Sequence, residues 1–414
     1  MDRKEIENEL KTRIEKFLSI FRKDDLFDNT RKSNFFIYVY GLKENYIVLL
    51  SEEERSLLYS PIEFMLEQRE ISKKYSYEFI ENEFYDLFHK IVTFDDSNSN
   101  DFKIFINDSK LDDHIKRLIN ELFNSQERTF YVVSEVENIK IKDEQEYKII
   151  DSTIKIMRQE NLPYEDRKFQ QLCKDLIGKP VIFTKVRAWD IDRAKEIALY
   201  NFKVSFSLIR LFSPFFMPVI KRRLVEERQC LVCYDEKEKI PHKEASLIRN
   251  PKFYPASLDD RIYSQLIYAG ITTLEKGSSI SKVVKDGLYW FVLGLDEEYL
   301  SAKLVDFTLV LESVLKKKDE RIELRRAIAE RGAILLFDTF EEREKAVEKL
   351  NKIYDARSEV VHTGTTIENK MIVSAAEKYA SEVLKKLIAK SKEFDGDHDK
   401  FIKSLDDKKL HGSI

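Results

Sequence analysis

The sequence predicts a mainly α-helical protein with an α+β region at the N-terminus and an antiparallel helical bundle at the C-terminus. All eight prolines lie at or before Pro255, so the last 159 residues contain none. Because proline lacks the N–H that a helix interior needs, this long segment favours helices. Eight of the ten glycines are isolated within it, where we expect them to separate one helix from the next. Runs of aromatic and β-branched residues lie earlier in the chain, and they predict strands.

Strand and helix patterns alternate in the first 250 residues. FFIYVY and NYIVLLS flank the segment GLKE and predict a β-hairpin over 35–40 and 45–51. From Trp189 to Val225 the apolar residues have helical spacing, with Ala198, Phe202 and Phe206 on one side. The other predicted strands are 102–106, 128–136 and 180–186, and the other helical segments are 2–23, 61–92 and 111–124.

The C-terminal part carries helical periodicity over 259–275, 281–294, 297–317, 321–338, 341–362 and 367–391. Asp338 and Thr339 can cap the fifth of these helices, and Gly364 stands where a left-handed residue ends a helix. Short connections between successive helices imply an antiparallel bundle. We therefore predict an α+β region over 1–188, a helical connector over 189–255, a helical bundle over 256–394 and a polar, frayed tail over 395–414.

Composition excludes several classes of protein. The formal charge of −4 excludes a strongly cationic nucleic-acid coat, although it allows a local basic groove. Gly41 and Gly178 are the only glycines before Gly270, so a phosphate-binding or dinucleotide-binding loop fits nowhere and no cofactor is expected. The charged N-terminus has no signal-peptide pattern, and the most apolar stretch, 204–220, is too broken to span a bilayer. We expect a reducing, cytoplasmic location and no membrane partner.

The cysteines raise the question of a metal site. Cys230 and Cys233 are followed by His242, which is part of the ligand set that structural zinc takes. A fourth ligand would have to come from the distant Cys173 or from another histidine. Two small buried cysteines on a strand explain the pattern better, and we predict no metal.

The segment 341–364 carries the chemically informative residues. At about 100° per residue, Arg357 falls in the middle of an apolar stripe formed by Ala346, Leu350 and Ile353. Since a guanidinium keeps its charge, an inward arginine needs a carboxylate, a polar seam or an anion. His362 lies about 140° away on the same helix. The two side chains can converge only if the helix unwinds near Gly364 or if a second copy of the chain supplies one of them.

This segment resembles a known family. The sequence YDARSEVVHTG contains R-x4-H over 357–362 and is similar to the ApeA-like branch of the HEPN ribonucleases, whose pattern is close to Y-x-x-R-S-x-[IV]-V-H-G. FTLVLESVL and LRRAIAERGAILL are similar to upstream helices of that family, so the resemblance covers about 281–391. One departure is Thr363, which stands between the histidine and the glycine.

The resemblance implies a metal-independent endoribonuclease that works as a homodimer on an RNA substrate. Arg357 would hold the scissile phosphate, His362 would be the general acid or base, Ser358 would orient either group, and Glu312 would pair with Arg357. The 2′-hydroxyl of RNA would be the nucleophile, so the protein need only move protons and stabilise charge. By family analogy the protein would be a toxin-like or antiviral defence effector of a bacterium, with the N-terminal region as its sensor.

Two alternatives remain open at the level of sequence. In the first, the bundle is a non-catalytic HEPN module for dimerisation or ligand binding, and Arg357 and Glu312 are a structural pair. The second concerns a basic run ahead of the motif, which is either a solvated helix face or a phosphate track for RNA. Of that run, the predicted RNA-binding residues are Lys316, Lys317, Lys318, Arg321 and Arg325.

Overall fold

A computed structural model provides the structure of the chain. It describes residues 1–22, 35–40, 45–95, 103–106, 108–137, 139–140, 147–150, 154–162, 169, 173–176, 178–212, 219–220, 222–223, 228–235, 241–247, 256–257, 270, 273–274, 277–318, 320 and 323–410. The chain divides into two compact units, and the first consists of Met1–Phe130, Arg187–Glu196 and Asp235–Glu238. The division into four domains that the sequence suggested stays a prediction.

Four helices build the core of the first unit: α1 (Arg3–Leu18), α2 (Glu52–Glu67), α4 (Tyr77–Ile91) and α5 (Asp108–Asn124). Short α3 (Arg69–Lys74) joins α2 to α4, and a 3-10 turn (Ser19–Arg22) ends α1. Phe17 is fully buried among these helices and contacts the rings of Phe84 and Phe88. The helical spacing over 61–92 predicted part of this arrangement. The prediction missed the first turns of α2, which begins at Glu52. Ser51 caps this helix, since its hydroxyl oxygen accepts a hydrogen bond from the backbone N–H of Glu54.

Two β-hairpins accompany these helices. The hairpin predicted at 35–51 is present, since β1 (Phe35–Tyr40) pairs antiparallel with β2 (Asn45–Leu50). The second joins β3 (Val92–Asp95), which was not predicted, to β4 (Lys103–Ile106), which was. Strand β3 continues directly from α4, and such a change of structure within one apolar run leaves no break in the hydrophobic pattern.

The second unit contains an eight-stranded sheet. Its main path has the order β11-β12-β5-β9-β8-β7, with β10 paired to β5 and β13 paired to β12. Strands β5 (Arg128–Glu137) and β9 (Pro180–Ala188) match the predicted ones. The other members are β7 (Tyr147–Ile150), β8 (Ile154–Arg158), β10 (Val219–Ile220), β11 (Arg222–Arg223), β12 (Arg228–Asp235) and β13 (Pro241–Leu247). Separately, β6 (Ile139–Lys140) pairs with β14 (Ala256–Ser257).

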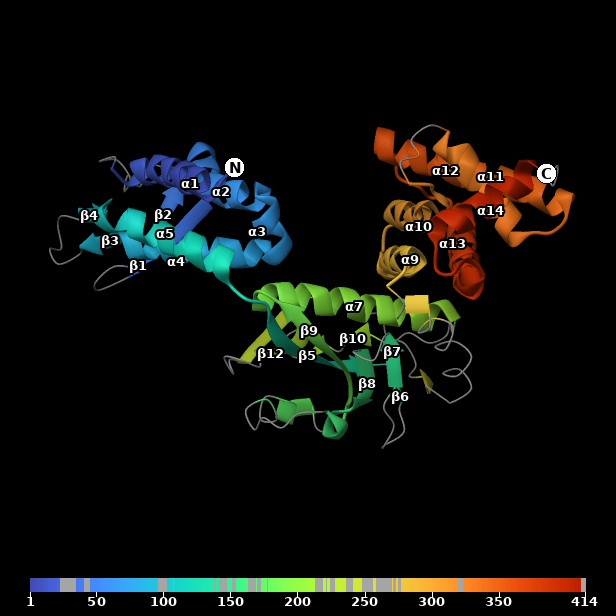
Figure 1. The fold of residues 1–414 in the computed structure, drawn as a ribbon, viewed down its shortest axis with the longest axis horizontal. Coiled ribbons are helices and arrows are strands. Elements are labelled where there is room, and N and C mark those ends of the chain that lie inside the picture. The colour runs from blue at the N-terminus through green and yellow to red at the C-terminus, as the bar shows by residue number, and fades with distance from the viewer. Residues whose placement is uncertain are drawn as a thin grey trace. The chain divides into compact units, whose positions relative to one another are not determined.

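Helix α7 (Ile191–Phe212) lies along one face of this sheet (Figure 1). Ala198, Phe202 and Phe206 are buried on it, as the helical spacing predicted. The expectation that the helix continues to Val225 was wrong, because the chain is in strand conformation again at β10 and β11. Pro214 and Pro218 explain the difference, since neither can donate the hydrogen bond that a longer helix requires.

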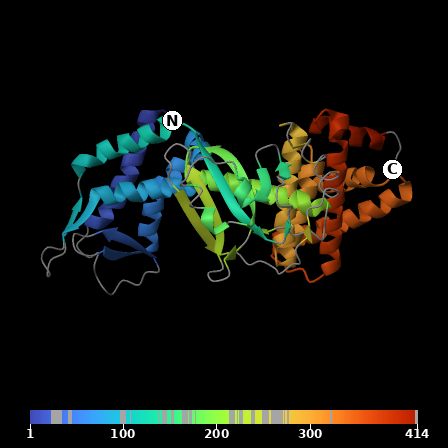
Figure 2. The same cartoon turned by 90° about the horizontal axis from the view of Figure 1, so that it is seen from below.

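The C-terminal part of the chain is helical, in agreement with the prediction (Figure 2). The first of its predicted helices, 259–275, lies mostly outside the described residues. The observed helices are α9 (Ser279–Asp296), α10 (Leu300–Leu315), α11 (Leu324–Leu336), α12 (Phe340–Thr363), α13 (Lys370–Lys390) and α14 (His398–Leu410). Helix α10 packs against α9, α11, α12 and α13, so it lies at the centre of this group.

Three glycines have a role that the sequence did not predict. Gly287 and Gly294 lie inside α9 and Gly332 inside α11, where each meets a neighbouring helix. A Cβ at Gly294 would lie 2.8 Å from the Phe307 ring of α10, and one at Gly287 would lie 2.8 Å from Leu384 of α13. These glycines let neighbouring helices approach closely.

The expectation of a frayed tail from residue 395 was wrong. Helix α14 covers residues 398–410, and Phe401, Ile402 and Leu405 on it are buried. His398, at its first turn, is also buried, and its Nε2 lies 2.8 Å from the carbonyl oxygen of Val314. The three apolar residues have the i, i+1, i+4 spacing of a buried helix face, but the surrounding aspartates and lysines outnumber them.

Candidate functional site

Helix α12 holds both residues of the R-x4-H motif. Its N-terminus is capped by Thr339, whose hydroxyl accepts from the backbone N–H of Glu342. Its C-terminus is closed by Gly364, which has φ of +68° and donates its N–H to the carbonyl of Val360. The helix is therefore regular through Arg357 and His362, and it does not unwind before Thr363.

Arg357 and Glu312 form an ion pair between α12 and α10. The Nη2 atom of Arg357 lies 3.7 Å from Oε1 of Glu312. The two side chains are 26% and 17% exposed, so the pair lies at the edge of the core and remains within reach of solvent. The carboxylate holds the guanidinium in place, and part of the guanidinium stays open to an anionic ligand.

Two polar atoms beside this pair are buried and unused. Within the part of the chain that the structure describes, neither Arg357 Nε nor the Tyr354 hydroxyl has a hydrogen-bond partner. Burial raises the pKa of Tyr354 well above its usual value, and the Glu312 charge adds to the effect, so the phenol stays protonated. A buried donor without a hydrogen-bond partner costs free energy of folding. A water or a ligand atom that accepts its hydrogen bond would recover that free energy.

His362 lies on a different side of α12 and is exposed, as is Ser358. Five residues along a helix correspond to a rotation of about 140° and a rise of about 7.5 Å, which keeps the imidazole away from the guanidinium. Among the described residues, no hydrogen bond or ion pair joins His362 or Ser358 to Arg357. A single chain thus brings Glu312 to Arg357, but it does not bring His362 or Ser358 there.

The predicted RNA-binding residues differ in exposure and in their ion-pair partners. Lys317 and Lys318 are exposed, Lys316 is half-buried, and Arg321 lies outside the described residues. Arg325 pairs with Asp355 at 2.6 Å and also donates to the side chain of Asn351. Arg325 of α11 is therefore already paired with Asp355 of α12 in a solvent-exposed ion pair, and it is not a free cation for RNA.

Arg331, further along the same basic run, is a structural residue. Its side chain is 7% exposed and contacts Glu320 at 2.6 Å and Asp406 at 2.7 Å. It also donates to the carbonyl of Leu315. Because its partners come from the α10–α11 connection and from α14, this arginine holds the last helix onto the bundle.

The structure adds one acidic residue that the sequence analysis missed. Burial, followed by the nearby charge of Glu297, raises the pKa of Asp306 on α10 to about 6. An aspartate inside the apolar run LVDFTLVL was the available signal. The structure also contains a lysine-rimmed groove between α12 and α13, whose residues are too dispersed in sequence to form a pattern.

The possible metal ligands lie on three different elements: strand β12, strand β13 and the short 3-10 turn Cys173–Leu176. The strand register sets Cys233 opposite His242 and Cys230 opposite Ala245, while Cys173 is buried elsewhere. Among the described residues there is no group of three or more histidine, cysteine, aspartate or glutamate side chains that could hold a metal ion. In the same residues, no helix is long and apolar enough to cross a membrane.

No known family model, no curated protein and no solved structure matches this chain. The function must therefore be inferred from the residues of α10 and α12 and from the motif on α12.

Proposed function

We propose that this protein is an HEPN-type, metal-independent endoribonuclease whose active site combines residues from two copies of the chain. The observation that carries the proposal is the Arg357–Glu312 pair, at the edge of the core of a helical region, on the same helix as an exposed His362. The positions of both residues within R-S-E-V-V-H support it, and so does the helical structure from 279 to 410.

The proposed cleavage uses the 2′-hydroxyl of the RNA together with His362 and Arg357. The 2′-oxygen of the RNA attacks the adjacent phosphorus, the bond from phosphorus to the 5′-oxygen breaks, and a 2′,3′-cyclic phosphate and a 5′-hydroxyl form. His362 moves the proton, either from the 2′-hydroxyl or to the leaving 5′-oxygen. Arg357 donates hydrogen bonds to the non-bridging oxygens and stabilises the charge that develops there.

The geometry of α12 supports a composite site. Arg357 and His362 point to different sides of one regular helix, so one chain alone does not present both to the same phosphate. A two-fold axis near the C-terminal end of α12 would set Arg357 of one copy beside His362 of the other, twice over. The predicted homodimer is therefore part of the proposed mechanism.

The biological role follows from the family resemblance. By analogy with the HEPN branch that the motif resembles, we propose a toxin-like, anti-phage activity with residues 1–188 in a sensing role. Lys317 and Lys318, which are exposed ahead of the motif, are the proposed contacts for the RNA backbone.

The product ends test the proposal. The purified protein is incubated with a mixed RNA substrate in excess EDTA, and the ends of the fragments are identified by sensitivity to phosphatase and by mass. We expect cleavage that survives the chelator and leaves 2′,3′-cyclic or 3′-phosphate ends. Fragments with 5′-phosphate and 3′-hydroxyl ends would require attack by water, which metal-assisted nucleases use, and they would contradict the mechanism.

A second candidate function has an observation in its favour. The charges of Arg357 and Glu312 both act on the buried phenol of Tyr354, and an ion pair of that kind can serve the architecture alone. In that case the bundle is a non-catalytic HEPN module for dimerisation, and the N-terminal region performs the recognition. RNA that stays intact in the presence of a well-folded dimer would favour this second function.

A further inference from the structure

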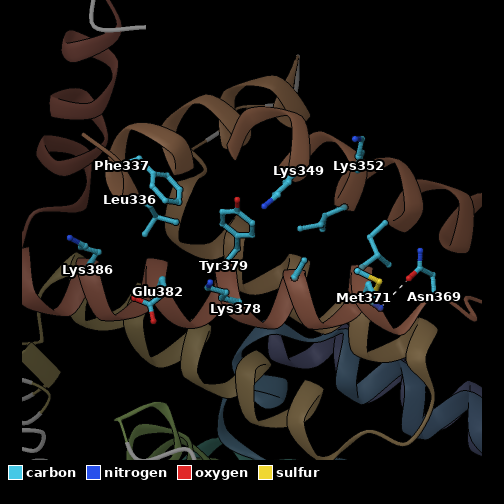
Figure 3. Close-up of a pocket in the computed structure, with 13 residues that line it drawn as sticks. Leu336, Phe337, Lys349, Lys352, Asn369, Met371, Lys378, Tyr379, Glu382 and Lys386 are labelled. Carbon is cyan, nitrogen blue, oxygen red and sulfur yellow. Dashed lines mark hydrogen bonds between the residues drawn. The ribbon is translucent and has the colours of Figure 1, made fainter. Parts of the chain in front are cut away.

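A long groove of about 760 Å³ lies between α12 and α13, next to the end of α11 (Figure 3). Its residues on α13 run from Met371 to Lys386, which corresponds to a length of about 22 Å along the helix. Helix α12 contributes Ile353 on the opposite wall. Neither residue of the Arg357–Glu312 pair lines the groove, and Arg357 lies one helical turn beyond the lining residue Ile353.

The surface inside the groove is mainly apolar. Met371 is 82% exposed, a large value for an apolar side chain in a helical bundle. Leu336, Phe337, Ile372 and Ala375 are half-buried and form the apolar floor beside it. An exposed apolar side chain beside such a floor favours a partner, and methionine adapts to partners of varied shape. The apolar lining consists of Leu336, Phe337, Ile353, Met371, Ile372 and Ala375.

Four lysines surround this apolar surface. Lys349 and Lys352 come from α12, and Lys378 and Lys386 come from α13, so both walls are basic (Figure 3). All four are exposed, and none has an ion-pair partner within the part of the chain that the structure describes. The one acidic lining residue, Glu382, is already paired with Lys385 at 2.9 Å. The groove therefore has an uncompensated positive charge along its whole length.

We propose that this groove binds an acidic amphipathic α-helix of a partner protein. Apolar side chains at i, i+3, i+4 and i+7 of such a helix would lie on the apolar lining, as in other helix-in-groove complexes. Glutamates and aspartates beside that stripe would meet the lysines on the two walls. The complementary charges would speed association and fix the register of the bound helix.

The groove fits a single-stranded nucleic acid less well. Such ligands use aromatic rings open to stacking. Tyr379, at the middle of the groove, is only 9% exposed, and Phe337, the other aromatic lining residue, is half-buried at one end. A single-headed anionic amphiphile would use a lysine cluster at one end, whereas these lysines are spread over both walls. The distribution of charge favours a ligand with several carboxylates along its length.

The proposal is independent of the ribonuclease activity, because it uses none of the residues proposed for RNA cleavage. A direct test uses a fluorescently labelled 18-residue peptide with leucine at the i, i+3, i+4 and i+7 positions and glutamate at the flanking ones. Its binding to the full-length protein is followed by fluorescence anisotropy. We expect saturable 1:1 binding that weakens as salt is added.

Charge reversal sharpens the test. Lys349→Glu together with Lys378→Glu should weaken binding of the glutamate peptide by roughly tenfold or more. The same double variant should gain affinity for a matched peptide in which lysines replace the glutamates. Lys403→Glu with Lys408→Glu is the matched control, since both lysines are exposed on α14 outside the groove, and it should leave binding of the glutamate peptide close to that of the unchanged protein. Ala375→Trp, which fills the apolar lining, should also weaken binding.

Four results would overturn the proposal. The first is absence of binding of the glutamate peptide to a protein that is folded by circular dichroism. The second is equal binding by the groove variant and the α14 control. The third is conversion of a dimer to monomers by the groove variant, which would assign the groove to a second copy of this chain. The fourth is preferential competition by a single-stranded oligonucleotide or by dodecyl phosphate, which would assign it to a different class of ligand.

Discussion

Arg357 and Glu312 join α12 to α10 through an ion pair of 3.7 Å in which both side chains are mostly, but not fully, buried. The pair places a fixed positive group at the edge of the helical core, and the Nε of the arginine has no partner among the described residues. His362 is exposed on another side of the same helix. The arginine is thus tied to the fold and the histidine is not, and the two should respond differently to mutation.

His362→Ala should abolish most RNA cleavage and leave the fold intact. Because the imidazole is exposed and has no contact in the core, its loss should change the free energy of unfolding by no more than about 1 kcal/mol. Removal of a general acid or base should lower the cleavage rate by roughly 10²–10⁴-fold. Cleavage assays and urea unfolding measure the two effects. Full activity of the folded variant would make the histidine dispensable and favour the non-catalytic module.

Arg357→Ala should lose both activity and stability. It leaves Glu312 partly buried without its partner, which we expect to cost about 1–2 kcal/mol, a value between those of exposed and buried pairs. Combining it with Glu312→Gln removes the unpaired charge, so the double variant should regain stability and remain inactive. Urea unfolding of the two single variants and the double variant gives the coupling. Equal stability of Arg357→Ala and the double variant would show that the unpaired charge of Glu312 is not what destabilises Arg357→Ala.

Arg331→Ala should destabilise the protein far more than Arg325→Ala, although both arginines belong to one basic run. Arg331 is buried between Glu320 and Asp406, and its removal should cost about 3 kcal/mol because two carboxylates lose their partner. Arg325 and Asp355 are both more than half exposed, so that pair should contribute less than about 1 kcal/mol. Thermal unfolding of both variants checks the difference, and equal losses would contradict the bridging role of Arg331.

Stability should fall as the pH decreases below about 6.5, the usual pKa of histidine, because of His398. Burial lowers the pKa of this residue in the folded protein, so the unfolded chain takes up the proton first. Protonation therefore stabilises the unfolded state relative to the folded protein as the pH falls. The contact with the carbonyl of Val314 needs a donating N–H, which the amide of His398→Gln can replace. Between pH 7.5 and 5.5 the melting temperature of the wild type should drop more than that of the variant. Parallel curves would show that His398 does not titrate with unfolding.

Periodicity and proline content predicted much of the fold. They indicated the helical C-terminal part, the hairpin at 35–50 and strands β5 and β9, because these elements have local signals of their own. Helix α14 was missed because its few apolar residues become meaningful only when Arg331 and Val314 lie opposite. The close packing at the glycines of α9 was not predicted for the same reason, since the approach of Phe307 and Leu384 is a tertiary contact.

Less of the candidate site than of the fold could be predicted from the sequence. The inward position of Arg357 followed from helical spacing, and Glu312 lies beside it in the structure. The burial of Tyr354 Oη, the raised pKa of Asp306 and the groove at Met371 depend on how separate helices pack, and no linear pattern contains them. The roles of these residues in catalysis stay predictions.

Subunit mixing tests directly whether Arg357 of one copy and His362 of the other form one ribonuclease site. Arg357→Ala and His362→Ala proteins carrying different tags are refolded together, co-assembly is verified by a two-tag pull-down, and RNA cleavage is measured in EDTA. Each variant alone should be inactive. In the mixture, half of the dimers are mixed and each of these has one intact site, so roughly a quarter of the wild-type activity should return. A co-assembled mixture that stays as inactive as its parents would contradict a site shared between the two copies.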